Sequence, residues 1–421
     1  MSSPPPGPVL VVGASLAGAT VAGQLRKVGY AGDITLVGAE TPLPYERPAL
    51  SKAYLTGTVG AGALLVHDAA FYPDNGITLR LGEPAAALDA DRRVVRLATG
   101  EQLPSGTLVI ATGAGNARPR IPGIDLAGVH QLRTLADVDA LRAALAAGAR
   151  TAVVVGMGFI GCEIAATLTG LGVAVTVVDG GPGPLWGPLG PELSAVARRW
   201  HEQHGVRVLT SQGVTALLPD ATGSAISTVE LGGGERLPAD LVVVGVGVRP
   251  NTSWLLDAPG APGRRGGRRG PRRPHQPAGG VRGRRFTATW DGTSGTHRRH
   301  EHWASAIAQG RRVARAVAGL DPEPPEAPYS WSDQYDKTLQ YSGEHDAEST
   351  LVLRGDLARP EQPLTGFFLR AGTVTAVLAV NDGKQFRRAQ RLLGLTPDPV
   401  DLADPAMDLR HLSQPTPSPA A

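Results

Sequence analysis

Two glycine-rich turns of the same type, one near the start of this chain and one well inside it, constrain its fold more than any other feature. The first reads Gly-Ala-Ser-Leu-Ala-Gly at residues 13–18, after the apolar run 9–12. The second reads Gly-Met-Gly-Phe-Ile-Gly at residues 156–161, after the apolar run 151–155. Glycines in such a turn let a strand lead tightly into a helix and let the backbone approach a pyrophosphate, which the helix N-terminus also attracts. The pair therefore predicts two strand–turn–helix units and two dinucleotide sites.

An acidic residue follows each turn at the end of a second apolar strand. Glu40 follows the first turn and Asp179 follows the second, each close to the position that dinucleotide-binding units use for an acid. A carboxylate at that strand end accepts hydrogen bonds from ribose hydroxyls, and it repels a 2′-phosphate, so Asp179 favours NAD over NADP. Ser15 replaces the middle glycine of the first turn, which weakens that motif. The alternatives are a plain strand–helix turn at the first site and a turn-initiating role for Asp179.

The succession of strands and helices is the same in both halves. A strand, a helix over about 17–28 and a strand at 33–38 are followed in the second half by a strand, a helix over about 160–170 and a strand at 174–178. Each half also has a late apolar strand that ends near glycine, at 107–111 and at 240–245. This predicts an α/β fold with two Rossmann-like dinucleotide-binding domains. After a Pro-rich joint at 321–328 we expect a small α+β C-terminal domain. Its expected strands lie near 349–354, 365–369 and 374–380, with a helix over about 384–393.

Composition narrows the class of protein. Cys162 is the one cysteine, so there is no redox cysteine pair, and we expect no metal site. Nine arginines and no acidic residue lie in 258–285. Without them 32 basic residues face 38 acidic ones, so the positive charge belongs to one segment and does not indicate nucleic-acid binding. No signal peptide or membrane span is recognisable, and we expect a cytoplasmic protein.

Two further places carry candidate chemistry. In the loop Pro-Tyr-Glu-Arg-Pro-Ala-Leu-Ser-Lys at 44–52, Arg47 and Lys52 could face a phosphate or the negative charge of a reduced flavin. The loop could equally be an ordinary solvated one. Glu163 lies one turn into the second helix, where a nicotinamide is expected, although it could merely stabilise the helix dipole. Together with the two turns, these residues suggest a flavoenzyme that takes electrons from a nicotinamide.

Several strings resemble one family, the FAD- and NADH-dependent ferredoxin reductases of oxygenase systems, the group of putidaredoxin reductase and the biphenyl-type dioxygenase reductases. The similarity spans residues 9 to about 395, and the fold it implies is glutathione reductase-like with no redox disulfide. The matching strings lie at 44–52, 111–113, 132–134, 156–163, 245–251, 301–303 and 331–334.

The resemblance implies cofactor-binding roles for individual residues. Lys52, Glu163 and Trp303 would lie near the flavin and nicotinamide, and no acid–base residue is strictly required. The residues implied to bind FAD are Gly13, Ala14, Ser15, Leu16, Ala17, Gly18, Glu40, Arg47, Lys52, Ala85, Ala111, Thr112, Gly113, Arg133 and Trp303. The residues implied to bind NADH are Gly156, Gly158, Phe159, Ile160, Gly161, Glu163, Asp179 and Gly245.

The activity implied is electron transfer from NADH through FAD to a small [2Fe–2S] or similar ferredoxin, which serves a cytochrome P450 or a ring-hydroxylating oxygenase. The FAD domain would comprise 1–115 and 252–325, the NAD domain 116–251 and a C-terminal interface domain 326–410, with a disordered tail at 411–421. Other acceptors remain open: rubredoxin, a nitrite reductase partner or oxygen. A flavin-free, inactive relative is a third possibility.

That third possibility arises from residues 258–285, most of which are Arg, Gly or Pro. The family carries a Gly-Asp pair near position 284, whose Asp holds the flavin ribityl chain, whereas Arg284 and Arg285 stand here. Because length is preserved while composition is alien, two compensating frameshifts, near 258 and 286, would explain the segment. A genuine basic insertion is the alternative. If the segment is real, FAD binding should weaken by about 1.5–3 kcal/mol, because a charge-assisted hydrogen bond is lost.

Overall fold

A computed structural model describes residues 7–255, 288–291, 296–299, 301–321, 323–324, 326–359 and 361–412. The aberrant segment 258–285 lies outside the described residues. The chain divides into two compact units. The first holds residues 1–47, 61–115 and 248–326, and the second holds 48–60, 116–247 and 327–421. Residues 48–60 thus group with the second unit and not with the flavin domain expected to contain them, because Ser51, Lys52 and Tyr54 all hydrogen-bond to residues of that unit.

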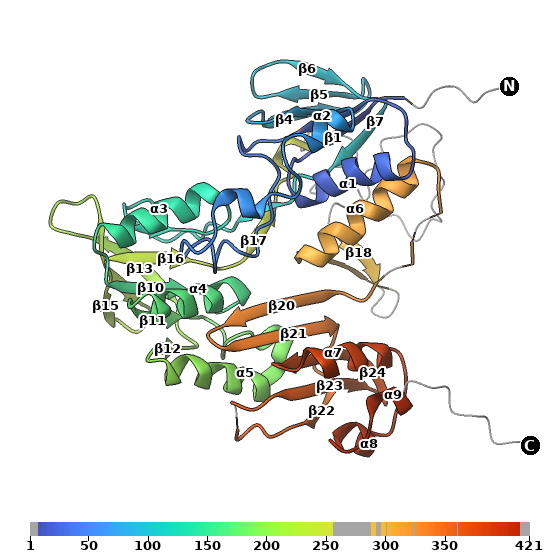
Figure 1. The fold of residues 1–421 in the computed structure, drawn as a ribbon. Helices are drawn as coiled ribbons and strands as arrows, with labels where there is room; N and C mark the ends of the chain where they lie inside the picture. Colours follow the sequence, from blue (N-terminus) through green and yellow to red (C-terminus); the bar gives the residue numbers. More distant parts are fainter. Residues whose placement is uncertain are drawn as a thin grey trace, which may run out of the picture. The chain divides into compact units, whose positions relative to one another are not determined.

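The first unit is built on a parallel four-stranded sheet of order β3-β2-β1-β7, of which Figure 1 labels β1 and β7. Its strands are β1 (Val9–Val12), β2 (Ile34–Val37), β3 (Ile77–Arg80) and β7 (Thr107–Ile110). β1 pairs with β2 on one side and with β7 on the other, so the chain reverses its direction of progress across the sheet at β1. In open α/β sheets, ligands bind outside the carboxyl ends of the strands at such a point, which is where the first glycine turn lies.

Helices and antiparallel strands complete the described part of the first unit. Helix α1 (Leu16–Lys27) follows the glycine turn and packs against α6 (Trp303–Val317), and the two lie side by side in Figure 1. The smaller elements are α2 (Phe71–Asp74), β4 (Ala85–Asp89), β5 (Val94–Leu97), β6 (Gln102–Pro104), β8 (Ala114–Asn116), β17 (Val248–Pro250), β18 (Ala288–Asp291) and β19 (Thr296–Arg299). Buried Leu10, Val12, Val95, Leu97 and Trp254 join the antiparallel β4–β6 sheet to the parallel one.

The second unit repeats this plan in a parallel sheet of order β12-β11-β10-β16-β9. β10 again lies between its successor β11 and a late strand, β16. The elements are β9 (Val129–His130), α3 (Leu135–Ala146), β10 (Thr151–Val155), α4 (Phe159–Gly170), β11 (Ala174–Val178), α5 (Trp186–Gln203), β12 (Arg207–Leu209) and β16 (Leu241–Val244). An antiparallel sheet comprises β13 (Val214–Pro219), β14 (Ile226–Leu231) and β15 (Arg236–Pro238).

The C-terminal part of the second unit is an antiparallel sheet of order β20-β21-β24-β23-β22 with helices after it. Its elements are β20 (Tyr329–Gln334), β21 (Lys337–Gly343), β22 (Thr350–Arg354), β23 (Leu364–Arg370), β24 (Thr373–Val380), α7 (Gly383–Ala389), α8 (Pro399–Ala403) and α9 (Leu409–Leu412). The disordered tail expected from residue 411 is therefore wrong for 411–412, which belong to α9. Buried Leu409 anchors this helix, and Arg354 donates to three backbone carbonyls around it. Residues 413–421 lie outside the described part of the chain.

We predict that Gly310→Ala destabilises the protein by about 1–3 kcal/mol. A β-carbon added at Gly310 of α6 would lie 2.9 Å from the side chain of Thr20, so α1 and α6 would have to separate. Gly170→Ala is the matched control, because Gly170 is also helical and a β-carbon there meets nothing within 4 Å. Denaturant unfolding of the two variants checks this, and equal stability of the two would contradict the close helix contact.

Candidate dinucleotide sites and a buried carboxylate

Both glycine turns have the same local geometry, imposed by the strand beside them. Gly13 has φ +116°, and a β-carbon there would lie 2.1 Å from the Ala111 carbonyl oxygen at the end of β7. Gly156 has φ +103°, and its β-carbon would lie 2.4 Å from the Gly245 carbonyl oxygen at the end of β16. Other residues would suffer both strain and overlap at these positions. The turns thus lie at matching points of the two sheets.

The last glycine of each turn allows its helix to begin close to the strand. A β-carbon at Gly18 would lie 1.9 Å from the Gly13 carbonyl oxygen, and one at Gly161 would lie 2.0 Å from that of Gly156. The N-cap residues of α1 and α4, Ser15 and Gly158, contribute no side-chain cap to the helix. Both helix N-termini can therefore receive an anionic pyrophosphate, as the sequence predicts.

At the first site, Glu40 lies among polar neighbours from the loop that follows. Its carboxylate accepts a hydrogen bond from the Tyr45 hydroxyl and pairs with Arg47 at 2.6 Å, and Arg47 also lies 5.0 Å from the centre of the Tyr45 ring. The Arg47 guanidinium also approaches the Ser15 hydroxyl at 3.5 Å. The structure therefore brings Glu40 and Arg47 to the first turn, where a carboxylate that accepts two bonds still has lone pairs for ribose hydroxyls.

The remaining residues expected at the FAD site are distributed over the two units. Ala85 begins β4, and Trp303 begins α6. Thr112 and Gly113 follow β7 and bond to Asn251, whose carbonyl accepts from the Thr112 hydroxyl at 2.8 Å. Lys52 and Arg133 lie in the second unit, with Arg133 just before α3. The first-turn residues, Glu40 and Arg47 fit an adenosine diphosphate moiety.

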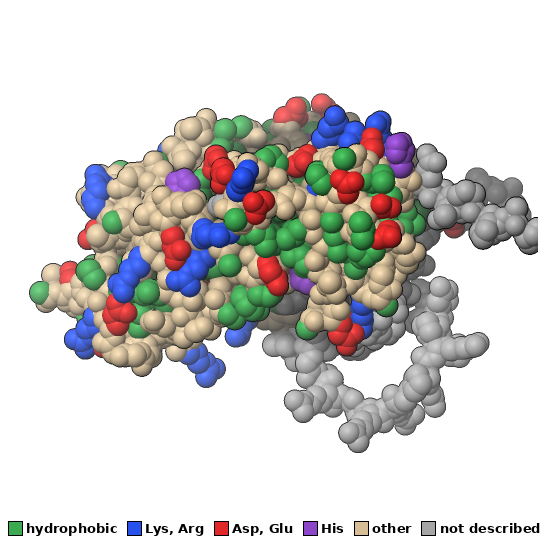
Figure 2. All heavy atoms as spheres, turned by 90° about the horizontal axis from the view of Figure 1, so that it is seen from below, with side chains coloured by type: hydrophobic (Ala, Val, Ile, Leu, Met, Phe, Trp, Pro, Cys, Tyr) green, Lys and Arg blue, Asp and Glu red, His purple; other side chains and the backbone are tan. Residues whose placement is uncertain are grey.

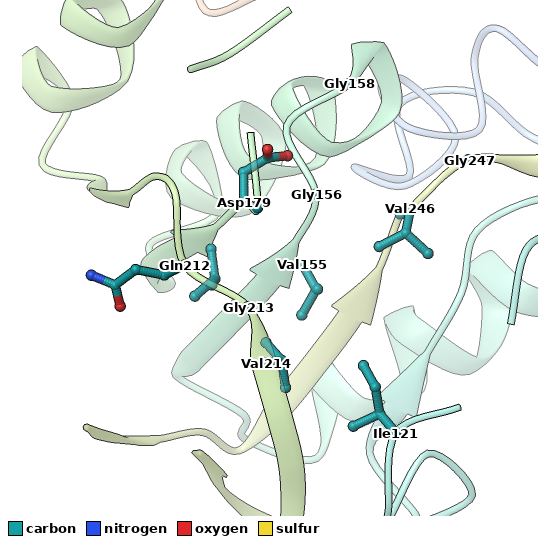
Figure 3. Close-up of a pocket in the computed structure, with 13 residues that line it drawn as sticks. Ile121, Val155, Gly156, Gly158, Asp179, Gln212, Gly213, Val214, Val246 and Gly247 are labelled. Atoms are coloured by element: carbon teal, nitrogen blue, oxygen red, sulfur yellow. The ribbon is translucent and has the colours of Figure 1, made fainter. Parts of the chain in front are cut away.

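A cavity of about 450 Å³ opens at the second turn (Figure 3). Gly156, Gly158, Asp179 and Gly245 of the sequence prediction line it. The cavity is also lined by Ile121, Val155, Val178, Gly180, Gln212, Gly213, Val214, Val246 and Gly247, which the sequence reasoning did not assign to the site. Val246 and Gly247 lie in the matching string 245–251, whereas Ile121, Gln212, Gly213 and Val214 come from segments with no recognisable motif. A lining of glycines, one carboxylate and apolar side chains suits one nucleotide half of a bound dinucleotide.

Asp179 holds the second turn together as well as lining the cavity. Its carboxylate accepts from the Met157 backbone N–H at 2.5 Å and from the Gly181 backbone N–H at 2.6 Å. Asp179 thus has the turn-initiating role and also presents a negative charge at the cavity wall. The structural and the coenzyme-binding interpretations of this residue are therefore compatible. Ile160, on the first turn of α4, is 41% exposed.

Glu163 of α4 belongs to a buried cluster of polar side chains in the second unit. Its side chain is 5% exposed and accepts from the Ser51 hydroxyl at 2.5 Å, the Ser332 hydroxyl at 2.9 Å and the Lys52 ammonium at 3.1 Å. Lys52 also pairs with Asp333 at 3.2 Å and lies 5.8 Å from the centre of the Trp331 ring. Burial raises the pKa of the Glu163 carboxyl, and Lys52 opposes that rise. The structure brings Lys52 and Glu163 into contact, and their expected place near the flavin and nicotinamide stays a prediction.

His201 of α5 is buried beside Tyr335, the residue that follows β20. Its Nδ1 lies 2.8 Å from the Tyr335 hydroxyl, and burial lowers the pKa of the imidazole to about 4. Neither residue carries a sequence signature for a functional role. A buried neutral histidine makes stability depend on pH, because the unfolded chain binds a proton that the folded chain does not.

The comparisons with known proteins agree with this geometry. Residues 7–269 match the family described as pyridine nucleotide-disulphide oxidoreductase, and residues 329–413 match reductase C-terminal. The chain is 41% identical over 410 residues to the anthranilate 1,2-dioxygenase system ferredoxin–NAD(+) reductase component of Burkholderia cepacia, with 96% of this chain and 98% of that protein covered.

Two similar solved structures extend the comparison. The ferredoxin reductase for the CYP199A2 system from Rhodopseudomonas palustris matches with a TM-score of 0.86 and 32% identity, over 97% of this chain and 100% of that one. The covalent putidaredoxin reductase–putidaredoxin complex matches with a TM-score of 0.86 and 30% identity, over 96% of this chain and 97% of that one.

Fold and site define an oxidoreductase with two dinucleotide sites. The chain belongs to the pyridine nucleotide-disulphide oxidoreductases and, among them, to the ferredoxin–NAD(+) reductase family. The predicted family, α/β fold class, enzyme class and cofactors, FAD and NAD(H), are confirmed. Within the described residues no helix is long and apolar enough to cross a membrane, and no His, Cys, Asp and Glu cluster could hold a metal ion. On the face drawn in Figure 2, acidic and basic side chains are interspersed.

We predict that wild-type protein loses more stability in acid than His201→Gln. The imidazole pKa is about 6.5 when unfolded and about 4 when folded, so stability falls as the pH falls from about 6.5 to about 4, by about 3 kcal/mol in total. Glutamine does not titrate, so His201→Gln lacks this contribution to the pH dependence of the free energy of unfolding. Denaturant unfolding at several pH values measures it, with His204→Gln, an exposed neighbour, as the control. Parallel slopes for wild type and His201→Gln would show that His201 is not buried as a neutral ring.

Proposed function

We propose that this chain carries electrons from NADH through FAD to a small iron–sulfur ferredoxin of an oxygenase system. The main observation in support of this proposal is the repeated turn. In both sheets a glycine with positive φ contacts the end of a late strand. Bound FAD supplies the conversion of a two-electron hydride donor into single electrons. The relatives named above act in a dioxygenase system, in a P450 system and with putidaredoxin, which supports a ferredoxin as the acceptor.

Cys162 supports a direct route from flavin to ferredoxin. It is the one cysteine of the chain, it is fully buried in α4, and burial raises the pKa of its thiol. A neutral, inaccessible thiol cannot relay electrons through a disulfide. The residues around the flavin therefore have to bind and orient the cofactor and need not form a covalent intermediate.

We assign the FAD domain to 1–47, 61–115 and 248–325, the NAD domain to 116–247 and the ferredoxin-interface domain to 326–410, with residues 48–60 grouped with the second unit. Gly13–Gly18, Glu40 and Arg47 hold the FAD adenosine diphosphate, and Thr112 with Gly113 closes the same site through Asn251. Lys52 and Glu163 lie at the flavin and nicotinamide end. We further place the protein in the cytoplasm, where NADH is regenerated.

In the NAD domain, Asp179 carries the preference for NADH. Its carboxylate stands at the wall of the cavity, and Gly180 beside it has no side chain that could neutralise a 2′-phosphate. Gly158 and the N-terminus of α4 receive the pyrophosphate, while Ile121, Val214 and Val246 provide apolar walls (Figure 3). The arrangement selects a free ribose hydroxyl.

We predict that Asp179→Asn raises the Kd for NADH about tenfold or more and narrows the preference over NADPH by a similar factor, because a hydrogen bond to a charged group is lost. Asp240→Asn is the matched control. Asp240 also accepts two backbone N–H groups, of Arg150 and Thr151, but it does not line the cavity. Coenzyme titration of both variants gives the comparison, and an equal loss in the two would assign Asp179 a purely structural role.

The acceptor is tested by NADH-driven cytochrome c reduction, with and without an added [2Fe–2S] ferredoxin. We predict that ferredoxin accelerates the rate severalfold, because a single-electron protein carrier matches the flavin's output. The flavin absorbance of the purified protein is recorded first. Protein that stays colourless after incubation with FAD would contradict the flavoenzyme assignment. The absence of the family's Gly-Asp flavin anchor from residues 258–285 would then account for the lack of flavin. Yellow protein with equal rates would contradict only the ferredoxin.

A further inference from the structure

The hydrogen bonds around Glu163 continue beyond the carboxylate. The Ser332 hydroxyl, which bonds to Glu163 at 2.9 Å, also lies 3.1 Å from the side-chain nitrogen of Gln334. Ser332 is 0% exposed and Gln334 is 1% exposed, so neither has water to replace these partners. A buried hydroxyl that accepts from the Gln334 amide has its own proton left to donate. That proton goes to the Glu163 carboxylate.

The next two side chains in this series of polar groups are Gln334 and His201. The side-chain oxygen Oε1 of Gln334 and the Nε2 atom of His201 are both buried without a hydrogen-bond partner of standard geometry. The two side chains are near neighbours, because Gln334 acts to raise the pKa of His201 against the larger, opposite effect of burial. Two orphaned polar atoms of opposite character in one dry region are expected to satisfy each other. His201 Nε2 would donate and Gln334 Oε1 would accept.

Tyr335 fixes the remaining nitrogen of the histidine. Its hydroxyl lies 2.8 Å from His201 Nδ1, and its ring stacks on His204 with centres 3.7 Å apart. Burial raises the pKa of this phenol, so it keeps its proton and donates. A neutral imidazole that accepts at Nδ1 must carry its proton at Nε2. This is the tautomer that the Gln334 oxygen requires.

We propose that His201 and Gln334 are positioning residues of a one-directional hydrogen-bond chain, Tyr335 to His201 to Gln334 to Ser332 to Glu163, which holds the Glu163 carboxyl ionised and fixed in orientation. Every donor in the chain points toward the carboxylate. The effect of this hydrogen-bond chain on the nicotinamide reaction rests on the function proposed above. The hydrogen bonds themselves are a property of the protein alone. Hydrogen bonds in a dry series polarise one another in the same direction, so the distant histidine acts on the carboxylate through two intermediates.

Other charged and titratable groups near Glu163 do not replace this chain. Lys52 pairs with Asp333 as well as with Glu163, so its charge compensates the Glu163 carboxylate only in part. Ser51 donates to the other carboxylate oxygen, so Oε1 depends on Lys52 and Ser332. Cys162 is the neighbour on α4 and stays neutral, since burial raises its pKa. The orientation of the Ser332 proton is therefore what His201 and Gln334 control.

The test measures the ionisation of Glu163 in the full-length protein. The carboxyl stretch that disappears in Glu163→Gln is followed by infrared difference spectroscopy as the pH changes. We expect His201→Leu and Gln334→Met to shift this titration upward by about one pH unit or more, which is the loss of one hydrogen bond to a charged group. We expect no shift in His201→Gln, whose amide can accept from Tyr335 and donate to Gln334, or in the control His204→Gln.

A titration in His201→Leu that matches wild type, or one in His201→Gln that shifts as far as His201→Leu, would overturn the proposal. Nitrogen-15 NMR of histidine-labelled wild-type protein gives a second measurement that needs no variant to fold. It should show the His201 proton on Nε2, and a proton on Nδ1 would reverse the chain and refute it. Reduction of bound flavin by NADH is measured separately, so that a failure of the proposed function leaves these two results interpretable.

Discussion

The rest of this structure depends on the contact between each glycine turn and the late strand beside it. An added β-carbon would come within 2.1 Å of the Ala111 carbonyl oxygen in one unit and within 2.4 Å of the Gly245 carbonyl oxygen in the other. The late strands therefore determine where the turns lie, and the turns in turn determine where the two helices begin. Because parallel strands end at the same edge of a sheet, the acidic residues after β2 and β11 reach the same places as the helix N-termini.

The same constraint explains why the parallel sheets could be predicted from sequence. β1, β10 and β11 are short, largely apolar runs next to a recognisable turn, and their observed bounds are those expected. The antiparallel strands β4–β6 and β13–β15 were not foreseen. Their apolar alternation is interrupted by register shifts, and their hydrophobic faces are completed by distant residues such as Trp254. No local pattern could indicate such pairing.

The candidate sites divide in the same way. Gly156, Gly158, Asp179 and Gly245 belong to recognisable strings, and all four line the cavity. The partners of Glu163 could not be foreseen as a set, because Ser51 and Ser332 lie 112 and 169 residues away along the chain. Serines and a glutamine have no signature for such a role. Their importance appears only once burial removes the water that would otherwise compete for their hydrogen bonds.

Burial also explains why the Glu163 carboxylate needs several hydrogen-bond donors around it. A carboxyl as enclosed as Glu163 would lose its charge unless several donors compensated for the missing water. Lys52 supplies charge, and the two serines supply direction. Because Lys52 comes from the segment 48–60 and Ser332 from β20, both segments are joined to α4 at one point of the second unit. A fixed negative charge there orients the neighbouring Lys52 ammonium group. The chemistry itself is left to the cofactors.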